Sequence, residues 1–413
     1  MPERRSADAD GERAAILALS LADGVGWRRF VALRAAFGSA QAVAAATQRE
    51  LRAVPGIGAK IAQAIAEVWE NDRAAAMISR CRSLGVRTVT FADAGYPERL
   101  LQTADPPLVI YASGDADLGY HWSVAIVGTR RPTLKGVLLA RQFAAELAEA
   151  GWLVVSGLAI GIDTAAHEGA LGVGGNTLAV LPGGLDCVYP PENEGLAARI
   201  AARGTLISEA PPGTKAVAGS FPARNRLISG IALGCVVVEA PERSGALITA
   251  RFAADSNREV FAVPGAPYLA QAAGCNALLR DGVNWAMQSE DIARVLVPIA
   301  GEPPPGGREH ARHPSGKGGR LTTPNGGLAA DDRPGADGGA GLENASQPFC
   351  AEAGESPEAG RVFASVRAGA MTLDAVSQDT ALAPSEAAVQ LSLLELCGKV
   401  TVRGGRYYTV ERR

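Results

Sequence analysis

Short apolar runs alternate with helical patterns through the middle of the chain. Residues 124–127 and 153–156 are two such runs, rich in β-branched side chains and typical of strands buried on both faces. Between them, apolar residues recur at helical spacing from 139 to 150, Pro132 stands where the first turn would begin, and Gly151 ends the helix. Such a strand–helix–strand unit crosses over right-handed into a parallel sheet.

The same alternation continues towards the C-terminus. Further apolar runs near residues 177, 205, 235 and 260 are each separated by a helical pattern, and a short strand within 105–115 is expected to join them. Strands that alternate with helices in this way predict an α/β fold with a doubly wound (Rossmann-like) parallel sheet. We place this core domain at residues 91–297.

Helical patterns dominate the region before the core. Residues 1–10 are expected to be disordered, and residues 11–90 to form a small helical domain. Its Val54-Pro-Gly-Ile-Gly turn resembles a helix-hairpin-helix motif, in which glycines let backbone N–H groups reach a nucleic-acid phosphate. The same hairpin occurs in purely structural helical domains, which we favour because only Lys60 is basic nearby.

Composition changes sharply after the core. Residues 298–360 are rich in Gly, Pro and charged residues and are expected to be a disordered linker. Residues 361–413 then predict three helices and a hairpin turning at Gly404-Gly405, which together indicate a winged helix. Because the expected third helix carries no Arg or Lys, a role in protein contact is favoured over reading a major groove.

Length, charge and cysteine use narrow the class of protein. The chain has 413 residues, 47% of them hydrophobic, which fits two or three domains with sizeable cores. Its formal net charge of −3 means that any nucleic-acid binding must come from a local basic patch. Six cysteines without a C-x-x-C pair fit a reduced, cytoplasmic protein, and no run of transmembrane length or signal peptide is visible.

The first strand–helix turn is a candidate anion site. It carries Gly128, Thr129 and Arg130, followed by Arg131, at the start of a helix whose N–H groups point outwards. Neither a G-x-G-x-x-G pattern nor a phosphate-binding loop with its lysine is present, so a dinucleotide or nucleoside-triphosphate site is not expected. A tight turn with two solvated arginines explains the same residues equally well.

Other strand ends along the same edge are polar or basic. Phe221, Arg224, Asn225 and Arg226 fall within about one helical turn, where Arg can bind phosphate and Phe can stack on an unpaired base. The competing interpretation pairs the arginines with Glu209 or Glu239 and puts Phe221 in the core. The remaining candidates at this edge are Ser156, Gly157, Lys215, Ser244 and Gly245.

Asp163 and His167 share a helix face at a spacing that could bind a metal ion. A capping Asp and a packed His are favoured instead, because no third ligand is evident. We therefore assign no metal, no cofactor and no catalytic residue.

Taken together, these motifs resemble the DNA processing protein A family (DprA, also called Smf), over nearly the whole chain. The motifs that carry the resemblance are Val127-Gly-Thr-Arg, Ser156-Gly-Leu-Ala-Ile-Gly-Ile-Asp, Leu181-Pro-Gly-Gly-Leu-Asp with Tyr189-Pro-Pro-Glu-Asn, Pro211-Pro-Gly-Thr-Lys, Phe221-Pro-Ala-Arg-Asn-Arg and Glu239-Ala-Pro-Glu-Arg-Ser-Gly-Ala. The resemblance implies a homodimeric, non-catalytic protein that binds single-stranded DNA without sequence preference. It also implies protection of incoming DNA in natural transformation, loading of a RecA-type recombinase and displacement of single-strand binding protein.

Two positions depart from the pattern of the family. Ile160 and Pro191 stand where many members carry a basic residue, so two phosphate contacts are expected to be lost unless Lys215 or Arg131 replaces them. Two other functions stay open beside DNA binding. The Pro182-Gly-Gly loop resembles that of nucleoside-monophosphate phosphoribohydrolases, although its glutamate is not at the matching spacing, and the terminal domains fit a protein-interaction scaffold.

Overall fold

The computed structural model describes residues 2–114, 118, 120–301, 303, 357–369, 372–382, 386–387, 390–391, 394, 399–403 and 406–409. The chain divides into two compact units, residues 1–314 and 315–413. None of the described helices is both long enough and apolar enough to cross a membrane.

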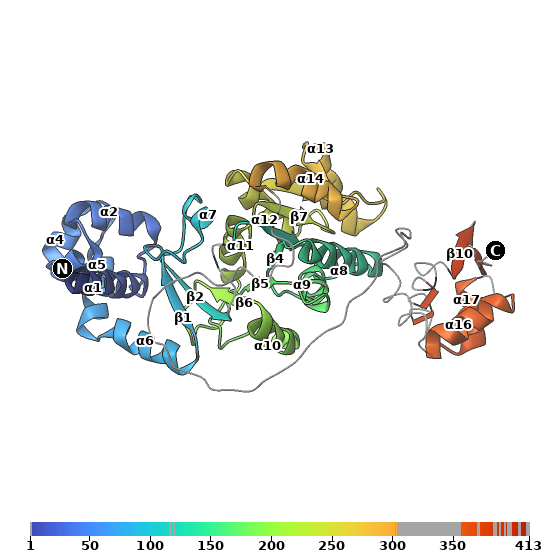
Figure 1. Ribbon diagram of the computed structural model, residues 1–413, viewed down its shortest axis with the longest axis horizontal. Helices are drawn as coiled ribbons and strands as arrows, with labels where there is room; N and C mark the ends of the chain where they lie inside the picture. Colours follow the sequence, from blue (N-terminus) through green and yellow to red (C-terminus); the bar gives the residue numbers. More distant parts are fainter. Residues whose placement is uncertain are drawn as a thin grey trace, which may run out of the picture. The chain divides into compact units, whose positions relative to one another are not determined.

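A nine-stranded sheet in the order β1-β2-β6-β5-β4-β3-β7-β8-β9 forms the centre of the first unit (Figure 1). Neighbouring strands from β6 through to β9 are parallel, which confirms the doubly wound fold, whereas β1 and β2 add to one edge antiparallel. The strands are β1 (Arg87–Thr90), β2 (Val109–Gly114), β3 (Ser123–Val127), β4 (Leu153–Ser156), β5 (Thr177–Val180), β6 (Thr205–Ser208), β7 (Gly234–Val237), β8 (Glu259–Ala262) and β9 (Asn284–Trp285).

Helices cover both faces of this sheet, and the alternation of side chains along β3 shows why. Val124 and Ile126 face one way, into a core shared with α8, α9 and α14, while Ala125 and Val127 face the core of α11, α12 and α13. The helices are α8 (Leu134–Glu149), α9 (Ile162–Gly172), α10 (Glu194–Arg203), α11 (Ser220–Ile231), α12 (Gly245–Asp255), α13 (Ala273–Arg280) and α14 (Ser289–Ala300).

The strand order creates a crevice between β3 and β7. The chain leaves β3 through α8 towards β4, on one side, and leaves β7 through α12 towards β8, on the other. Helices therefore diverge at the carboxyl ends of these two strands, and open α/β sheets bind their ligands at such switch points.

Six helices gather beside the β1 edge of the sheet (Figure 1). They are α1 (Pro2–Ser20), α2 (Trp27–Phe37), α3 (Ala40–Ala44), α4 (Gln48–Ala53), α5 (Ala59–Glu70) and α6 (Arg73–Ser83). The expected disorder of residues 1–10 is wrong for residues 2–10, which belong to α1. Buried apolar residues of these helices form one continuous core with β2, β6 and α10, so the helical region is packed onto the sheet.

The predicted hairpin lies between α4 and α5. Its Gly56 has φ +84°, a conformation that glycine adopts without strain, and Arg29 donates a hydrogen bond to the carbonyl oxygen of Gly56 over 3.1 Å.

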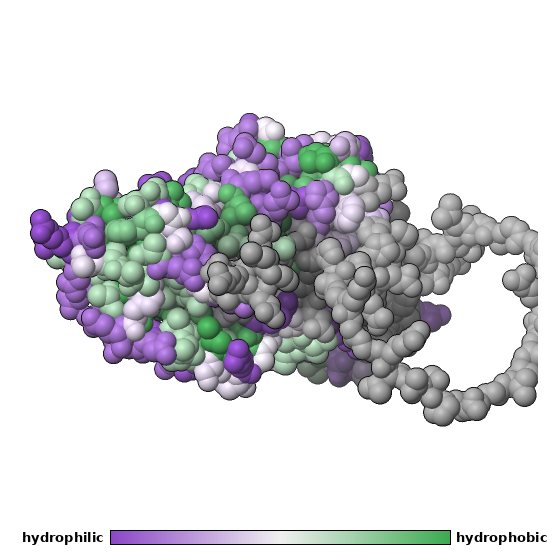
Figure 2. Space-filling view, turned by 60° about the vertical axis from the view of Figure 1, so that its left-hand side comes forward, coloured by the Kyte–Doolittle hydropathy of each residue, from purple (hydrophilic) through white to green (hydrophobic). Residues whose placement is uncertain are grey.

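On the face shown in Figure 2, strongly hydrophobic colour is confined to small areas separated by hydrophilic ones among the described residues. Apolar side chains here therefore serve mainly the internal cores.

The second unit contains α16 (Pro357–Arg367), α17 (Leu373–Thr380) and an antiparallel pair, β10 (Val400–Arg403) and β11 (Arg406–Thr409). Buried apolar residues from the helices and β10 share one core. Only parts of the expected third helix are described, and they are helical at residues 386–387, 390–391 and 394. The Gly404-Gly405 turn and most of the predicted linker lie outside the described residues.

Candidate functional site

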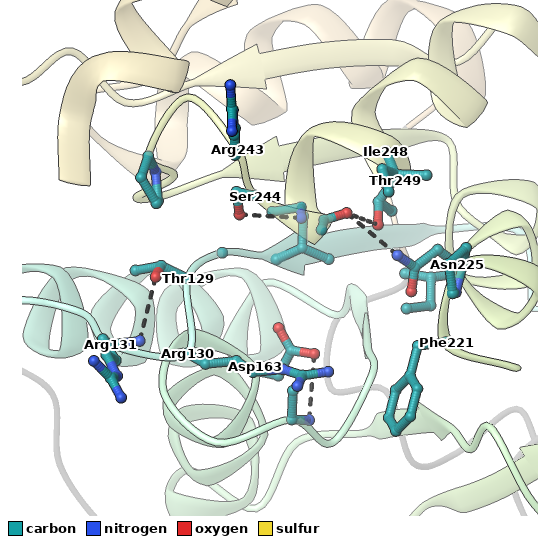
Figure 3. A pocket seen from close by; sticks show the side chains of 18 of the residues that line it. Thr129, Arg130, Arg131, Asp163, Phe221, Asn225, Arg243, Ser244, Ile248 and Thr249 are labelled. Carbon is teal, nitrogen blue, oxygen red and sulfur yellow. Dashed lines mark hydrogen bonds between the residues drawn. The ribbon is translucent and has the colours of Figure 1, made fainter. Parts of the chain in front are cut away.

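A pocket of about 530 Å³ opens at the crevice between β3 and β7 (Figure 3). The loops that follow β3, β4 and β7 form its walls together with α11 and α12. Most of the residues expected at the binding edge line it: Gly128, Thr129, Arg130, Phe221, Arg224, Asn225, Ser244 and Gly245. Ser156, Gly157, Lys215 and Arg226 do not line the pocket.

Three exposed arginines, Arg130, Arg131 and Arg243, stand around this pocket, and we call them the arginine rim. None of them takes part in an ion pair within the described part of the chain. Ser244 caps α12 beside them, its hydroxyl accepting a hydrogen bond from the Ala246 N–H over 3.3 Å. The partial positive charge of that helix end therefore adds to the charge of the rim.

An aromatic pair flanks the pocket. The Arg130 guanidinium extends towards Phe221 (Figure 3) and lies 5.1 Å from the centre of its ring. Tyr189 meets the same ring edge-on, with the two ring centres 5.4 Å apart, and is 46% exposed. Phe221 is partly buried and lines the pocket, so it links the exposed ring of Tyr189 to Arg130 of the arginine rim.

Arg224 differs from the expected phosphate ligand, because it is 94% buried. Its Nη1 donates to the carbonyl oxygens of Gly157 and Val180, which ties the ends of β4 and β5 together. Burial lowers the pKa of Arg224 to about 10, against the opposing effect of Asp163, so the side chain is charged at neutral pH. Arg224 supports the floor of the pocket and adds a positive charge beneath it.

Asp163 and His167 lie below the same floor. Asp163 accepts hydrogen bonds from the N–H groups of Gly157 and Ala159, at 3.1 and 3.4 Å, rather than from its own helix. Burial lowers the pKa of His167 to about 3, and its Nδ1 lies 2.7 Å from the Thr177 hydroxyl. This arrangement fits the packed-histidine interpretation, and no group of three potential metal ligands occurs among the described residues.

The glycines of the two predicted turns also serve packing within the protein. A Cβ at Gly128 would lie 2.5 Å from Ile162 and 2.9 Å from the Glu239 carbonyl oxygen, so the glycine permits α9 and the end of β7 to approach. At the second turn, the Gly157 N–H is bound to Asp163. The Ser156 hydroxyl is fully buried and donates to the Ile126 carbonyl oxygen over 2.6 Å.

Arg226 follows the competing interpretation made from the sequence. It is an ion-pair partner of Glu209, with 2.5 Å between Nη2 and the carboxylate, and it donates to the Asp105 carbonyl oxygen. The side chain is 15% exposed and points away from the pocket, towards α7 (Glu98–Leu101) and the loop that follows it. Lys215, by contrast, is exposed on the loop between β6 and α11.

Sequence reasoning missed Tyr189 and Arg243 as site residues. Both lie inside motifs that were recognised, but the spacing of neither residue indicated a role. Ile160 is 42% exposed and Pro191 is also exposed, so a basic residue at either position would reach solvent.

The start of α8 also differs from the prediction. The helix begins at Leu134 rather than at Pro132, and Thr133 caps it, with its hydroxyl accepting from the Gly136 N–H over 3.0 Å.

Three known protein families match successive regions of this chain. The family described as DNA recombination-mediator protein A matches residues 87–297, which include the whole pocket. This chain belongs to that family. A SAM-like helix-hairpin-helix tandem matches residues 16–71, and a DprA winged helix domain matches residues 347–406. The predicted family, the helix-hairpin-helix region and the winged helix are thereby confirmed.

Individual members of the DprA family resemble this chain along most of its length. Protein Smf of Synechocystis sp. is 34% identical over 366 residues, covering 86% of this chain and 88% of that protein. The crystal structure of DNA processing protein A from Streptococcus pneumoniae covers 69% of this chain and 97% of its own, with 28% identity and a TM-score of 0.60. A structure of DNA processing protein A from Helicobacter pylori, described for its single-stranded DNA binding mode, covers 52% of this chain and 97% of its own. The identity is 31% and the TM-score is 0.47.

Proposed function

We propose that this protein is a non-catalytic recombination mediator that holds single-stranded DNA at the pocket between β3 and β7. The observation that carries the proposal is the arginine rim, Arg130, Arg131 and Arg243, standing unpaired beside an exposed aromatic pair. Arginine binds phosphate strongly, and an arginine without an ion-pair partner is available to a phosphate group. The overall charge of −3 makes this local cluster the natural place for an anionic polymer.

Single strands fit this site better than duplexes. Tyr189 and Phe221 can stack only on bases that are not already stacked in a double helix. The helix α11 brings Phe221 and Asn225 to the pocket. Its two arginines are engaged within the protein, and the Asn225 amide donates to the Gly245 carbonyl oxygen over 3.2 Å, so α11 does not present a row of free base-reading side chains as a recognition helix does. Binding through phosphates and stacking is independent of sequence and sensitive to salt.

The same geometry argues against a hydrolase. Among the described residues that line the pocket, Asp163 is the only acid, and it lies next to Arg224 with two N–H donors on its carboxylate. Asp186, on the loop that resembles a phosphoribohydrolase loop, is bound to Arg80 and to the Gly213 N–H. The two N–H donors engage one oxygen of Asp163, and Arg80 and Gly213 engage both oxygens of Asp186, so each carboxylate already has a structural role, which favours binding without chemistry.

Membership of a recombination-mediator family supports the wider role. A mediator delivers single strands to a recombinase, so we propose a RecA-type recombinase and single-strand binding protein as partners, with incoming DNA protected meanwhile. We also propose a cytoplasmic homodimer with a functional division near residue 90. The expected boundaries at residues 297 and 360 fall inside α14 (Ser289–Ala300) and α16 (Pro357–Arg367), so the ends of these two helices are the better limits of the core and of the winged helix.

Fluorescence anisotropy of a labelled single-stranded oligonucleotide tests this function directly. The Arg130→Ala/Arg243→Ala variant should bind at least about ten times more weakly than wild type, and its salt slope should fall by about 1.4, or 0.7 per lost phosphate contact. Arg251→Ala is the control, because Arg251 is exposed on α12 but does not line the pocket. The proposal would be refuted if Arg251→Ala lost as much affinity as the Arg130→Ala/Arg243→Ala variant, or if wild type bound a duplex as tightly as a single strand.

A further inference from the structure

Arg80, on α6 of the helical region, reaches across to the loop that follows β5. Its Nη2 lies 2.9 Å from Oδ2 of Asp186, and both side chains are only partly exposed, at 51% and 20%. Exposed ion pairs of this kind contribute little stability, so the contact calls for an explanation beyond holding the fold together.

The second oxygen of Asp186 continues the contact to another loop. Oδ1 accepts a hydrogen bond from the Gly213 N–H over 2.7 Å, and the Gly184 N–H donates to the Thr214 carbonyl oxygen over 2.8 Å. Burial raises the pKa of Asp186, but the hydrogen bonds from Arg80 and Gly213 lower it by more. The pKa of Asp186 therefore lies below its usual value. The carboxylate is therefore ionised at neutral pH and accepts both hydrogen bonds.

Arg80 also covers Gly213 directly. A Cβ built on Gly213 would lie 2.9 Å from Nη2 and 3.1 Å from Cζ of Arg80, so the guanidinium packs closely on the backbone of this glycine. Gly213 has φ +90°, which other residues rarely adopt. The Arg80 guanidinium and the Asp186 carboxylate thus both hold Gly213, and the Gly184 N–H holds the carbonyl oxygen of Thr214.

Lys215 follows this clamp immediately in the chain. It is exposed, and it belongs to the loop that joins β6 to α11, the helix that carries Phe221 and Asn225 into the pocket. Fixing residues 213–214 therefore fixes where the Lys215 side chain begins.

We propose that Arg80 is a positioning residue, which holds the Lys215 loop through Asp186 and so couples the helical region to single-strand binding. The inference rests on the proposed function. Through Arg80, the helical region would influence DNA affinity even if its hairpin does not contact DNA.

Salt-dependent anisotropy of the full chain with single-stranded DNA tests the coupling. Lys215→Ala should lower the salt slope by about 0.7, the loss expected for one contact on a single strand. Arg80→Ala should give a comparable loss, and the Arg80→Ala/Lys215→Ala variant should bind no more weakly than Lys215→Ala alone. Arg13→Ala is the matched control, because Arg13 joins α1 to Asp93 by a 2.8 Å ion pair remote from this loop and should leave the slope unchanged.

Asp186→Ala gives the sharpest distinction, since it removes a negative charge near the DNA. Simple electrostatics predicts tighter binding for this variant, whereas loss of positioning predicts weaker binding with a smaller slope. Tighter binding would overturn the inference, as would a slope lowered by Lys215→Ala but not by Arg80→Ala; in both cases the proposed function stands. Failure of the wild-type protein to prefer single strands would instead refute the proposed function and the inference with it.

Discussion

Replacing Arg224 by Met tests whether this arginine supports the pocket floor or binds DNA directly. Methionine keeps much of the side-chain length but removes the charge and the donors that hold the carbonyl oxygens of Gly157 and Val180. It also leaves Asp163 buried without its neighbouring positive charge. Truncating one partner of a buried charged pair costs about 3–5 kcal/mol, because the other charge stays uncompensated.

Urea unfolding at neutral pH measures this loss. With a denaturant slope of about 3 kcal/mol per M, a loss of 3–5 kcal/mol moves the midpoint down by about 1–1.7 M. The Arg224→Met/Asp163→Asn variant should recover at least half of the shift, since the Asn oxygen can still accept from the Gly157 N–H. A single variant within about 0.5 kcal/mol of wild type, with a salt slope for DNA lowered by one contact, would refute the supporting role.

The pH dependence of the same variant gives an independent check. Burial raises the pKa of Asp163 and the Arg224 charge opposes that rise, so Arg224→Met should raise the pKa further. A carboxyl group with a raised folded-state pKa destabilises the fold progressively as the pH rises from its unfolded-state pKa to its folded-state pKa. The stability deficit of Arg224→Met should therefore shrink as the pH is lowered from neutrality towards the unfolded-state pKa, and grow again on returning to neutrality.

Two further outcomes are expected. Gly169→Ala should destabilise the protein by about 1–3 kcal/mol in urea unfolding, because the new methyl would overlap the Arg141 carbonyl oxygen, whereas Gly172→Ala, with nothing within 4 Å, should be neutral or slightly stabilising. Greater stability of Gly169→Ala would contradict the close packing of α8 on α9. Deleting residues 304–413 should leave most single-strand affinity in anisotropy, and loss of binding would move the main site away from the pocket.

The sheet was predictable from sequence because each core strand is a short apolar run between two helical patterns in the sequence. A run of this length and composition favours a buried strand over another helix. The position of the pocket followed as well, since strand ends at a switch point converge whatever their side chains. Helix starts were less predictable. Thr133 caps α8 partly because Glu239, more than a hundred residues later, accepts both its N–H and its hydroxyl at 2.8 and 2.5 Å.

Glycine was the least informative signal about the site. Gly128 and Gly157 were expected to admit a ligand, yet a Cβ at either position would collide with protein atoms, Ile162 in one case and the Arg224 guanidinium in the other. A glycine at a strand end shows that something comes close to the backbone, but the local sequence does not show whether that neighbour is a ligand or another part of the chain.

For the two arginines of α11, the sequence held more information about burial than the prediction used. Arg224 and Arg226 are two residues apart and therefore point to different sides of the helix. Leu227, Ile228 and Ile231 mark the buried side, and Arg224 stands three and four residues before the first two, so helical spacing alone puts it among them. A charge on that side must find carbonyl or carboxylate partners inside the protein, so Arg224 supports the pocket, and the exposed rim is where we propose that phosphate binds.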